Sequence, residues 1–379
     1  MFKKRIYLDY NATMPVSDEV ATAIMEALQN YGNPSSVHTE GQKANRLLES
    51  NRQKIANLFN IDKDKITFTS GATEAAATLL TPHWKMGRSK LVFSHLYIGA
   101  TEHPCVAKGH SFKNDQVTSI PVNNDGLINI DFLTEALTNH DKNKGLPLVS
   151  IQAANSETGV LQDIPKLYAL VKNYGAIFIV DAVQYIGRYK ISNLSEFADF
   201  IFISGHKIGA AKGIGAFINS SNLLAPDPLL KGGGQEKGLR SGTQSVPLIA
   251  SFGTAAEQIN KQLDSNLWNN EKLTYLENAL QNICPDIIIY GKNVKRLPNT
   301  CYFTIPHKKA ETLQIAFDLC GIAVSSGKAC SSSRVSINEV ILAMGYNPDN
   351  GAIRVSIGLE TQLSDLDQFI RSFKQILNN

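Results

Sequence analysis

The sequence has few cysteines, no long hydrophobic run and little net charge. Its five cysteines are scattered, odd in number and without a CxxC pair, so we expect neither a disulfide framework nor a metal site. No window approaches the ~20 consecutive apolar residues of a membrane helix. The basic residues near the start of the chain are not followed by the apolar segment of a secretory signal. These absences predict a cytoplasmic protein without a membrane contact.

The charges are nearly balanced, with 37 Lys and Arg against 34 Asp and Glu, a formal net charge of +3. No dense basic segment interleaved with aromatic residues is present, so direct nucleic-acid binding is not expected. Hydrophobic residues make up 43% of the chain and charged residues 19%, which is typical of a globular protein. A chain of 379 residues is long enough for two domains.

Short apolar, β-branched runs alternate with longer helical patterns through the first two thirds of the chain. This alternation predicts an α/β domain in which a mostly parallel sheet has helices on both faces. One helix is expected from Ser17, which can cap it, to about Tyr31. The expected strands lie at 66–69, 90–94, 147–151, 176–181, 198–204 and 213–218.

The pattern changes after about residue 255. One long helical pattern over 255–283 is followed by short strands and helices, which predicts a smaller α+β domain. We place the boundary inside the long helix. The expected domains are a large α/β domain at 13–258 and a small domain made of 1–12 and 259–379.

Polar residues follow several of the expected strands, and in parallel sheets ligands bind at that edge. Ser70 to Thr73 lead from a strand into a helix, and their small side chains expose backbone N–H groups where a phosphate can bind. Many ordinary turns look the same, so this motif is weak by itself. Asp181 directly follows a hydrophobic strand, where it either caps the next helix or pairs with a buried positive nitrogen.

The next strand ends in Ser204, His206 and Lys207. A partly desolvated lysine at the ligand edge has a lowered pKa and is a nucleophilic amine. Lys212 is a competing candidate that fits a surface position better. A phosphate cradle, a buried carboxylate and a strand-end lysine are together what pyridoxal 5'-phosphate requires, namely a phosphate anchor, a partner for the pyridinium nitrogen and an amine for the aldehyde.

One cysteine stands apart from the others. Cys330 lies in the small polar segment SSGKACSSSR, between the cations Lys328 and Arg334. Nearby positive charge lowers a thiol pKa, and a polar surrounding leaves the sulfur accessible. The remaining cysteines lie in or beside apolar patterns or near a helix end, where we expect them to be inert: Cys105, Cys284, Cys301 and Cys320.

Across nearly its whole length the chain resembles the cysteine desulfurases, within the class V aminotransferase group of fold-type I pyridoxal-phosphate enzymes. It is most similar to the branch that supplies sulfur for nitrogenase and iron–sulfur clusters. The matching segments include YLDYNATMPV, GNPSSVH, FTSGATEA, TEH, ANSETGVLQDI, DAVQ, SGHKIGAAKGIGA, GGGQEKGLRSGT, GIAVSSGKACSSS and AIRVSIG. The resemblance implies a seven-stranded, mostly parallel mixed sheet in the large domain and a homodimer with shared active sites.

The resemblance also implies a role for each matching residue. Lys207 and Cys330 would be catalytic, with His103 stacked on the cofactor and relaying protons. Arg354 would bind the substrate carboxylate with its two-pronged guanidinium, and Asn155 would contact the cofactor ring oxygen or the substrate. Asp181 would pair with the pyridinium and Gln184 would donate to the ring hydroxyl. The phosphate would be held by Ala72, Thr73, Ser204, His206 and the partner's counterpart of Thr243.

The implied reaction removes sulfur from L-cysteine. The freed amine of Lys207 takes the Cα proton while Asp181 keeps the cofactor ring protonated. The thiolate of Cys330 attacks the substrate sulfur, giving alanine and a Cys330 persulfide. The persulfide would serve sulfur-acceptor proteins, such as an iron–sulfur scaffold or a sulfur carrier, or tRNA thiolation.

Other functions fit parts of the pattern. An ordinary class V aminotransferase needs Lys207 and Arg354 but not Cys330, and a selenocysteine lyase could work without the thiol. A non-catalytic scaffold of sulfur transfer is the alternative from another class. The chain departs from the family at Ala76 and Ala77, at Lys328, and in a shorter segment between Cys330 and Arg354, and the short segment bears on the choice of sulfur acceptor.

Overall fold

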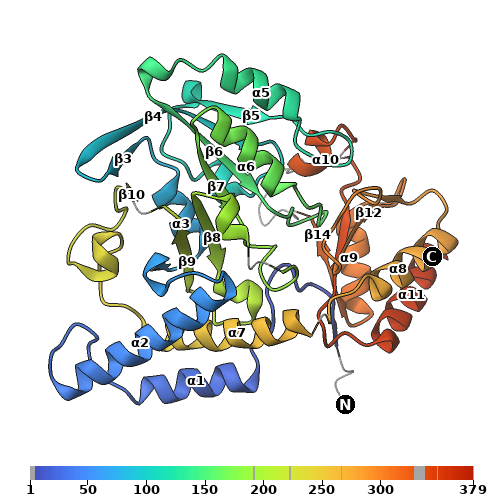
Figure 1. Cartoon of the computed structure of the whole chain (residues 1–379). Helices are drawn as coiled ribbons and strands as arrows, with labels where there is room; N and C mark the ends of the chain where they lie inside the picture. The colour runs from blue at the N-terminus through green and yellow to red at the C-terminus, as the bar shows by residue number, and fades with distance from the viewer. Residues whose placement is uncertain are drawn as a thin grey trace.

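Two structural units of unequal size share the chain (Figure 1). The computed structural model describes residues 5–190, 193–221, 223–265, 267–327, 338–347 and 349–378. Cys330, Lys328 and Arg334 lie outside the described residues.

A mixed nine-stranded sheet forms the larger unit, in the order β10-β3-β4-β6-β7-β8-β9-β2, with β5 on β4. The pairs from β5 through β4, β6 and β7 to β8 are parallel, and β9 runs antiparallel to both its neighbours. The strands are β2 (Ile66–Thr69), β3 (His83–Met86), β4 (Ser89–Gly99), β5 (Val117–Ile120), β6 (Leu146–Gln152), β7 (Ile177–Asp181), β8 (Phe200–Ser204), β9 (Gly215–Asn219) and β10 (Leu224–Pro226).

Both faces of this sheet are buried, which explains why its central strands read as continuous apolar runs. Alternate residues of β7 enter different cores, with Phe178 and Val180 in one and Ile177 and Ile179 in the other. α1, α2 and α7 pack together along one side of the sheet (Figure 1). The helices are α1 (Asp18–Leu28), α2 (Thr39–Leu58), α3 (Ala72–Leu79), α4 (Pro104–Ala107), α5 (Ile130–Thr138), α6 (Ile164–Asn173) and α7 (Val246–Asp264).

The smaller unit has its own core. Its four-stranded antiparallel sheet has the order β11-β12-β15-β14, and the side chains of α8, α9 and α11 pack against it. Residues from the chain's start join this unit, because β1 (Ile6–Tyr7) pairs in parallel with β13. The other elements are α8 (Glu271–Ile283), β11 (Ile288–Ile289), β12 (Thr300–Thr304), α9 (Ala310–Leu319), β13 (Ile322–Ala323), β14 (Ser325–Ser326), α10 (Glu339–Ala343), β15 (Ile353–Ser356) and α11 (Leu363–Asn378).

The structure agrees with the expected α/β class and differs from the sequence-based expectation in two details. All six strands expected from the sequence pattern are present, and β3, β5 and β10 bring the sheet to nine, two more than the seven that the resemblance implies. The single long helix expected over 255–283 is wrong, because α7 ends at Asp264 and α8 begins at Glu271. Leu263 packs on the first core and Leu273 belongs to the second. The domain boundary proposed at 258/259 stays a prediction.

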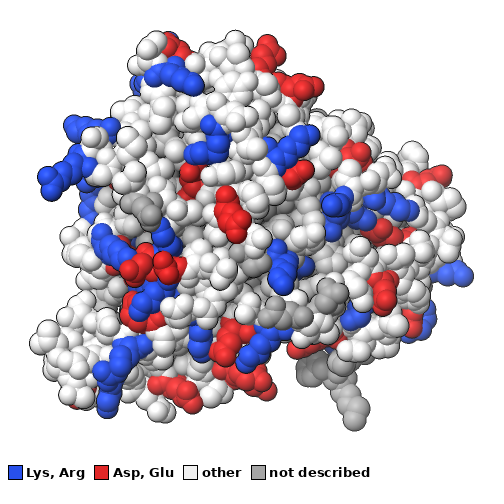
Figure 2. Space-filling view, viewed as in Figure 1, with Lys and Arg blue, Asp and Glu red and all other residues white. Residues whose placement is uncertain are grey.

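The surface carries mixed charge. On the face shown in Figure 2, Lys and Arg side chains are interspersed with Asp and Glu. Among the helices of the described residues, none is both long and apolar enough to cross a membrane.

Candidate active site

A cavity of about 260 Å³ lies at the carboxyl ends of β6, β7 and β8 and reaches Arg354 of the smaller unit. The sheet register aligns Gln152 with Asp181 at this edge. Many of the predicted site residues line the cavity, namely His103, Asp181, Gln184, Ser204, His206, Lys207 and Arg354. Because parallel strands end at one edge, residues far apart in the sequence meet there.

Lys207 lies in a short 3-10 turn, Gly205–Ile208, that directly follows β8. Its Nζ donates to the carbonyl oxygens of Asn11 at 2.6 Å and Ala12 at 3.0 Å. Burial is the main cause that lowers the pKa of Lys207 to about 7, with repulsion from neighbouring arginines adding to it. The amine is therefore available as a base or nucleophile near neutral pH. Lys212, the competing candidate, is exposed and does not line the cavity.

Asp181 ends β7 with a side chain that is only 6% exposed. Its Oδ1 accepts from the Val183 N–H at 2.8 Å within a turn, and no helix of the described residues starts there, so the expected alternative of a helix cap does not apply. Burial raises the pKa of Asp181 to about 7, against the lowering effect of that hydrogen bond and of Lys207. A buried carboxyl of this kind is suited to pairing with a positive nitrogen.

The predicted phosphate cradle lies at the start of α3, whose first residues are Ala72 and Thr73 after the cap Gly71. A Cβ on Gly215 would lie 2.7 Å from the Gly71 Cα, so glycine at 215 lets β9 approach this turn. The Ser204 Oγ lies 4.0 Å from where a Cβ of Gly71 would be. Backbone N–H groups at a helix start beside a hydroxyl form a site for an anion.

His206 and His103 both line the cavity. Burial, then the charges of Lys207 and Lys212, lower the pKa of His206 to about 4, so its imidazole is neutral at pH 7. His103 precedes α4, and its Nδ1 accepts from the Cys105 N–H at 3.2 Å. That contact fixes the ring's orientation at the cavity wall.

Asn155 and Gln184, two further predicted site residues, are held by hydrogen bonds within the protein. Asn155 is buried but does not line the cavity, because its amide Oδ1 accepts from Glu157 and Thr158 and its Nδ2 donates to the Thr101 carbonyl. These contacts shape a turn, and the expected contact of Asn155 with the cofactor or the substrate stays a prediction. Gln184 donates from its Nε2 to the Asn11 carbonyl at 3.0 Å, and its buried Oε1 has no partner among the described residues. Its expected hydrogen bond to the ring hydroxyl stays a prediction.

Thr243 is exposed and does not line this cavity. Its expected contact with a partner subunit's phosphate stays a prediction. Arg354, in contrast, lies on β15 with a side chain that is 10% exposed, and its Nη2 is 2.8 Å from Asp9 Oδ1.

Sequence reasoning assigned no role to several residues that shape the site. Asn11 and Ala12 accept from Lys207, and their signal was present in the segment YLDYNATMPV. Arg188 is 4% exposed and donates to the carbonyl oxygens of Gln184 and Tyr10. No pattern in the sequence distinguishes such an arginine from a surface cation.

A second buried carboxyl lies near Asp181. Glu102 is 6% exposed, and burial followed by the charge of Asp181 raises its pKa well above the usual range. One of its oxygens accepts from the Gln152 N–H at 2.7 Å. Cys105 also lines the cavity, but burial and the nearby carboxyls raise its thiol pKa, so it remains protonated and a poor nucleophile.

The residues present fit pyridoxal phosphate. The amine of Lys207 and the carboxyl of Asp181 face one cavity, and the Gln184 Oε1 and Arg354 Nε are buried polar atoms without a partner among the described residues. The turn before α3 is the expected phosphate anchor, and glycine at 215 lets β9 lie close to that turn. These are the groups that the cofactor's aldehyde, pyridinium and phosphate require.

Comparisons with known proteins agree with this fit. The family model "Aminotransferase class-V" matches residues 6–369, and this family depends on pyridoxal phosphate. The chain is 36% identical to a cysteine desulfurase of Trichormus azollae, over 98% of the chain and 92% of the relative. It is 32% identical to the cysteine desulfurase IscS of Dictyoglomus turgidum, over 99% of the chain and 95% of the relative.

Solved structures agree as well. A NifS-like protein from Rickettsia africae superposes with a TM-score of 0.86 at 35% identity, covering 99% of this chain and all of the other. An apo cysteine desulfurase from Thermococcus onnurineus, at 21% identity and a TM-score of 0.82, has the same fold over 99% of this chain and 95% of the other. The chain therefore belongs to the class-V aminotransferase family, and within it to the cysteine desulfurases.

Proposed function

We propose that the protein removes sulfur from L-cysteine, releases alanine and carries the sulfur as a persulfide on Cys330. The observation that supports it best is one cavity that joins Lys207, Asp181 and Arg354 in a chain with nearly full-length similarity to cysteine desulfurases. Bound pyridoxal phosphate supplies an electron sink for the bond that must break at the substrate.

Each residue of the cavity has a defined task in this proposal. Arg354 binds the substrate carboxylate, and Asp181 holds the positive ring nitrogen of the cofactor. Lys207, with a pKa lowered to about 7, takes the proton from the substrate Cα and later returns a proton. His103, which lines the cavity, moves protons to or from the substrate.

Cys330 completes the transfer. Its thiolate attacks the substrate sulfur, an S–S bond forms, and the substrate C–S bond breaks with its electron pair left on the substrate carbon. Protonation of that carbon gives alanine, so one cysteine and one thiol become one alanine and one persulfide. No oxidant or reductant is consumed.

The persulfide then passes to an acceptor protein, for which we propose an iron–sulfur scaffold or a sulfur carrier. The reaction belongs in a reducing compartment, and we propose the cytoplasm. We also propose that the protein acts as a homodimer in which Thr243 of one subunit reaches the phosphate site of the other.

The decisive experiment compares Cys330→Ser with wild type and with Cys320→Ser, which removes a half-buried cysteine outside the cavity. Wild type and Cys320→Ser should form alanine from L-cysteine, and mass spectrometry should find one added sulfur on the Cys330 peptide. Cys330→Ser should bind cofactor normally and form almost no alanine. Alanine formation at the wild-type rate without Cys330 would sink the assignment and favour a lyase. Failure of the wild type to bind cofactor would favour a non-catalytic scaffold.

A further inference from the structure

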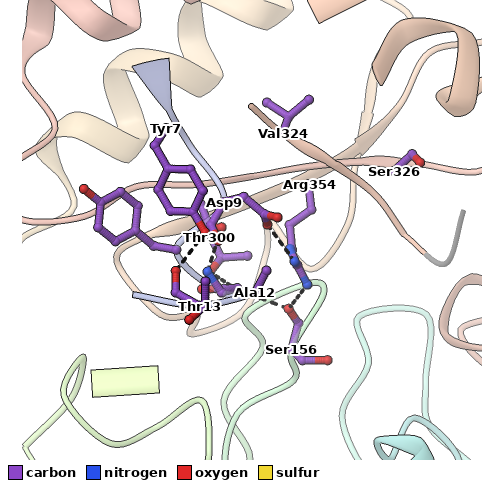
Figure 3. A network of polar contacts seen from close by, with 12 residues as sticks. Tyr7, Asp9, Ala12, Thr13, Ser156, Thr300, Val324, Ser326 and Arg354 are labelled. Atoms are coloured by element: carbon purple, nitrogen blue, oxygen red, sulfur yellow. Dashed lines mark hydrogen bonds and ion pairs between the residues drawn. The ribbon is translucent and has the colours of Figure 1, made fainter. Parts of the chain in front are cut away.

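The guanidinium of Arg354 is held in place by two other chain segments (Figure 3). Its Nη2 donates to Asp9 Oδ1 at 2.8 Å, and its Nη1 donates to the carbonyl oxygen of Ser156 at 3.0 Å. Arg354 itself lies on β15 of the smaller unit, whereas Ser156 follows β6 of the larger one. The position of this cation therefore depends on contacts from outside its own strand.

Part of the guanidinium remains free. Its Nε is buried and has no acceptor among the described residues, although the side chain lines the cavity. A buried donor without a partner is unfavourable, and in a cavity wall it is a natural place for an acceptor of the ligand. A carboxylate can accept from Nε while Asp9 remains bound to Nη2, because an arginine carries five N–H donors in a fixed plane.

Asp9 is a rigid support. It forms an isolated parallel bridge with Ser356, two residues after Arg354 in the sequence. The Tyr7 hydroxyl lies 2.9 Å from the Asp9 carbonyl and 2.8 Å from the Thr13 carbonyl, and shares its proton between them. Figure 3 shows the Asp9 carboxylate directed at the guanidinium from this braced turn. Its position does not depend on a mobile side chain of the surface.

The charge around the cavity makes Asp9 important. The charge of Arg354 lowers the pKa of Arg188, and the charges of both arginines lower the pKa of Lys207. Arg188 donates to carbonyl oxygens, whereas Arg354 has an ion pair with Asp9. Without that carboxylate, Arg354 would be a nearly buried cation facing two others, and its side chain would be expected to turn away.

We propose that Asp9 is a positioning residue that holds Arg354 so that its free N–H groups bind the α-carboxylate of L-cysteine. Asp9 stays on Nη2 when the substrate binds, and the substrate carboxylate takes Nε. The selectivity for an amino acid over a simple amine thus depends on a residue that never touches the substrate. This inference rests on the proposed function, because it takes the substrate to be an α-amino acid.

The test measures binding of L-alanine, the proposed product, and of ethylamine, which matches alanine but lacks its carboxylate. Both are titrated against the cofactor-loaded protein and followed by the absorbance of the bound cofactor. The variants are Asp9→Asn, which keeps the shape, and Asp9→Ala. The control is Asp318→Asn, which removes the same charge from an exposed ion pair with Arg5. Thermal unfolding of each cofactor-free variant reports on the fold.

For L-alanine, Asp9→Asn should raise the Kd about tenfold and Asp9→Ala should raise it further, as expected for loss of a charge-assisted contact. The Kd of ethylamine should change less than about twofold. An unchanged L-alanine Kd would refute the proposal. An equal rise for both ligands would indicate a merely structural role, and tighter L-alanine binding would show that Asp9 competes with the substrate. None of these readouts involves Cys330, so they separate this proposal from the sulfur-transfer assignment.

Discussion

At the scale of single residues, the site keeps charged groups in positions where folding alone would disfavour them. Asp181 is 6% exposed and Lys207 is half-buried, and burial is the main cause that brings the pKa of each to about 7. A protein that needed only stability would place apolar side chains there. The loss of stability from burying these charges is offset when the cofactor binds, because the cofactor brings groups of the opposite charge.

A first prediction concerns Asp181→Asn in the cofactor-free protein. The carboxyl is neutral in the folded and the unfolded chain below its ordinary pKa of 3.8, and ionised in both above about 7. The free energy of unfolding therefore falls between these pH values, because the carboxyl ionises more easily in the unfolded chain than in the folded one. The amide keeps an acceptor for Val183 and should stabilise the protein at pH 8 by on the order of 3 kcal/mol, but hardly at pH 4.

Urea unfolding at pH 4, 6 and 8 measures this difference in stability. A cofactor titration measures the accompanying loss of cofactor affinity. The same variant should bind pyridoxal phosphate much more weakly, since it cannot pair with a pyridinium. A gain in stability that is equal at pH 4 and pH 8 would contradict the buried-charge argument.

The same scale shows what sequence can and cannot predict about a site. Lys207, Asp181 and Ser204 were predictable because each directly follows an apolar strand, and strand ends meet at one edge. Arg188 was not predictable, because its role depends on a contact with Tyr10, which lies 178 positions away in the sequence. Periodicity carries no information on such contacts.

At the scale of elements, the strands that the sequence predicts are those buried on both faces. Every residue of β7 and β8 is buried, and each strand is apolar up to its last residue. β3 was missed because only Trp84 of its four residues is buried. The sequence pattern did not separate α7 from α8, because Leu267 and Trp268 continue the apolar pattern across the break. In the structure, Leu267 is 55% exposed.

A second prediction concerns the contact between β9 and the turn before α3. In Gly215→Ala, the added methyl would meet the Gly71 Cα at 2.7 Å and the Ile203 carbonyl oxygen at 2.7 Å. Backbone must move, so we expect a loss of about 1–3 kcal/mol in stability and weaker cofactor binding through the displaced anion site. Gly234→Ala is the matched control, since its Cβ would meet no atom within 4 Å.

Both variants are compared by urea unfolding and by cofactor dissociation. If Gly215→Ala lost stability yet kept its cofactor affinity, the turn before α3 would not be the phosphate site.

At the scale of the whole molecule, the loop that carries Thr243 is anchored to the larger unit by buried polar contacts. Glu236, whose side chain has no exposure, accepts from Arg52 at 2.7 and 2.8 Å and from the Phe68 N–H at 2.9 Å. Gln244 also donates to it at 3.0 Å. An exposed Thr243 on a loop anchored in this way is suited to reach a second subunit.

A third prediction tests the shared site by mixing two inactive chains. Lys207→Ala and Thr243→Asp should each be inactive as homodimers, the latter because a carboxylate would repel the phosphate. Co-expression gives mixed dimers in which one site has both intact residues. About a quarter of the wild-type activity should return if assembly is random, measured as alanine formation. Co-expression without recovery would show that each subunit uses only its own residues.

The pairing of β1 with β13 joins residues 6–7 to residues 322–323. During synthesis, the turn that contacts Lys207 and Arg354 cannot take its place until nearly the whole chain has left the ribosome. Contacts between such distant parts of a chain form late. The larger unit can thus fold early while its binding pocket stays incomplete. The cofactor site is then complete only after most of the chain has been synthesised.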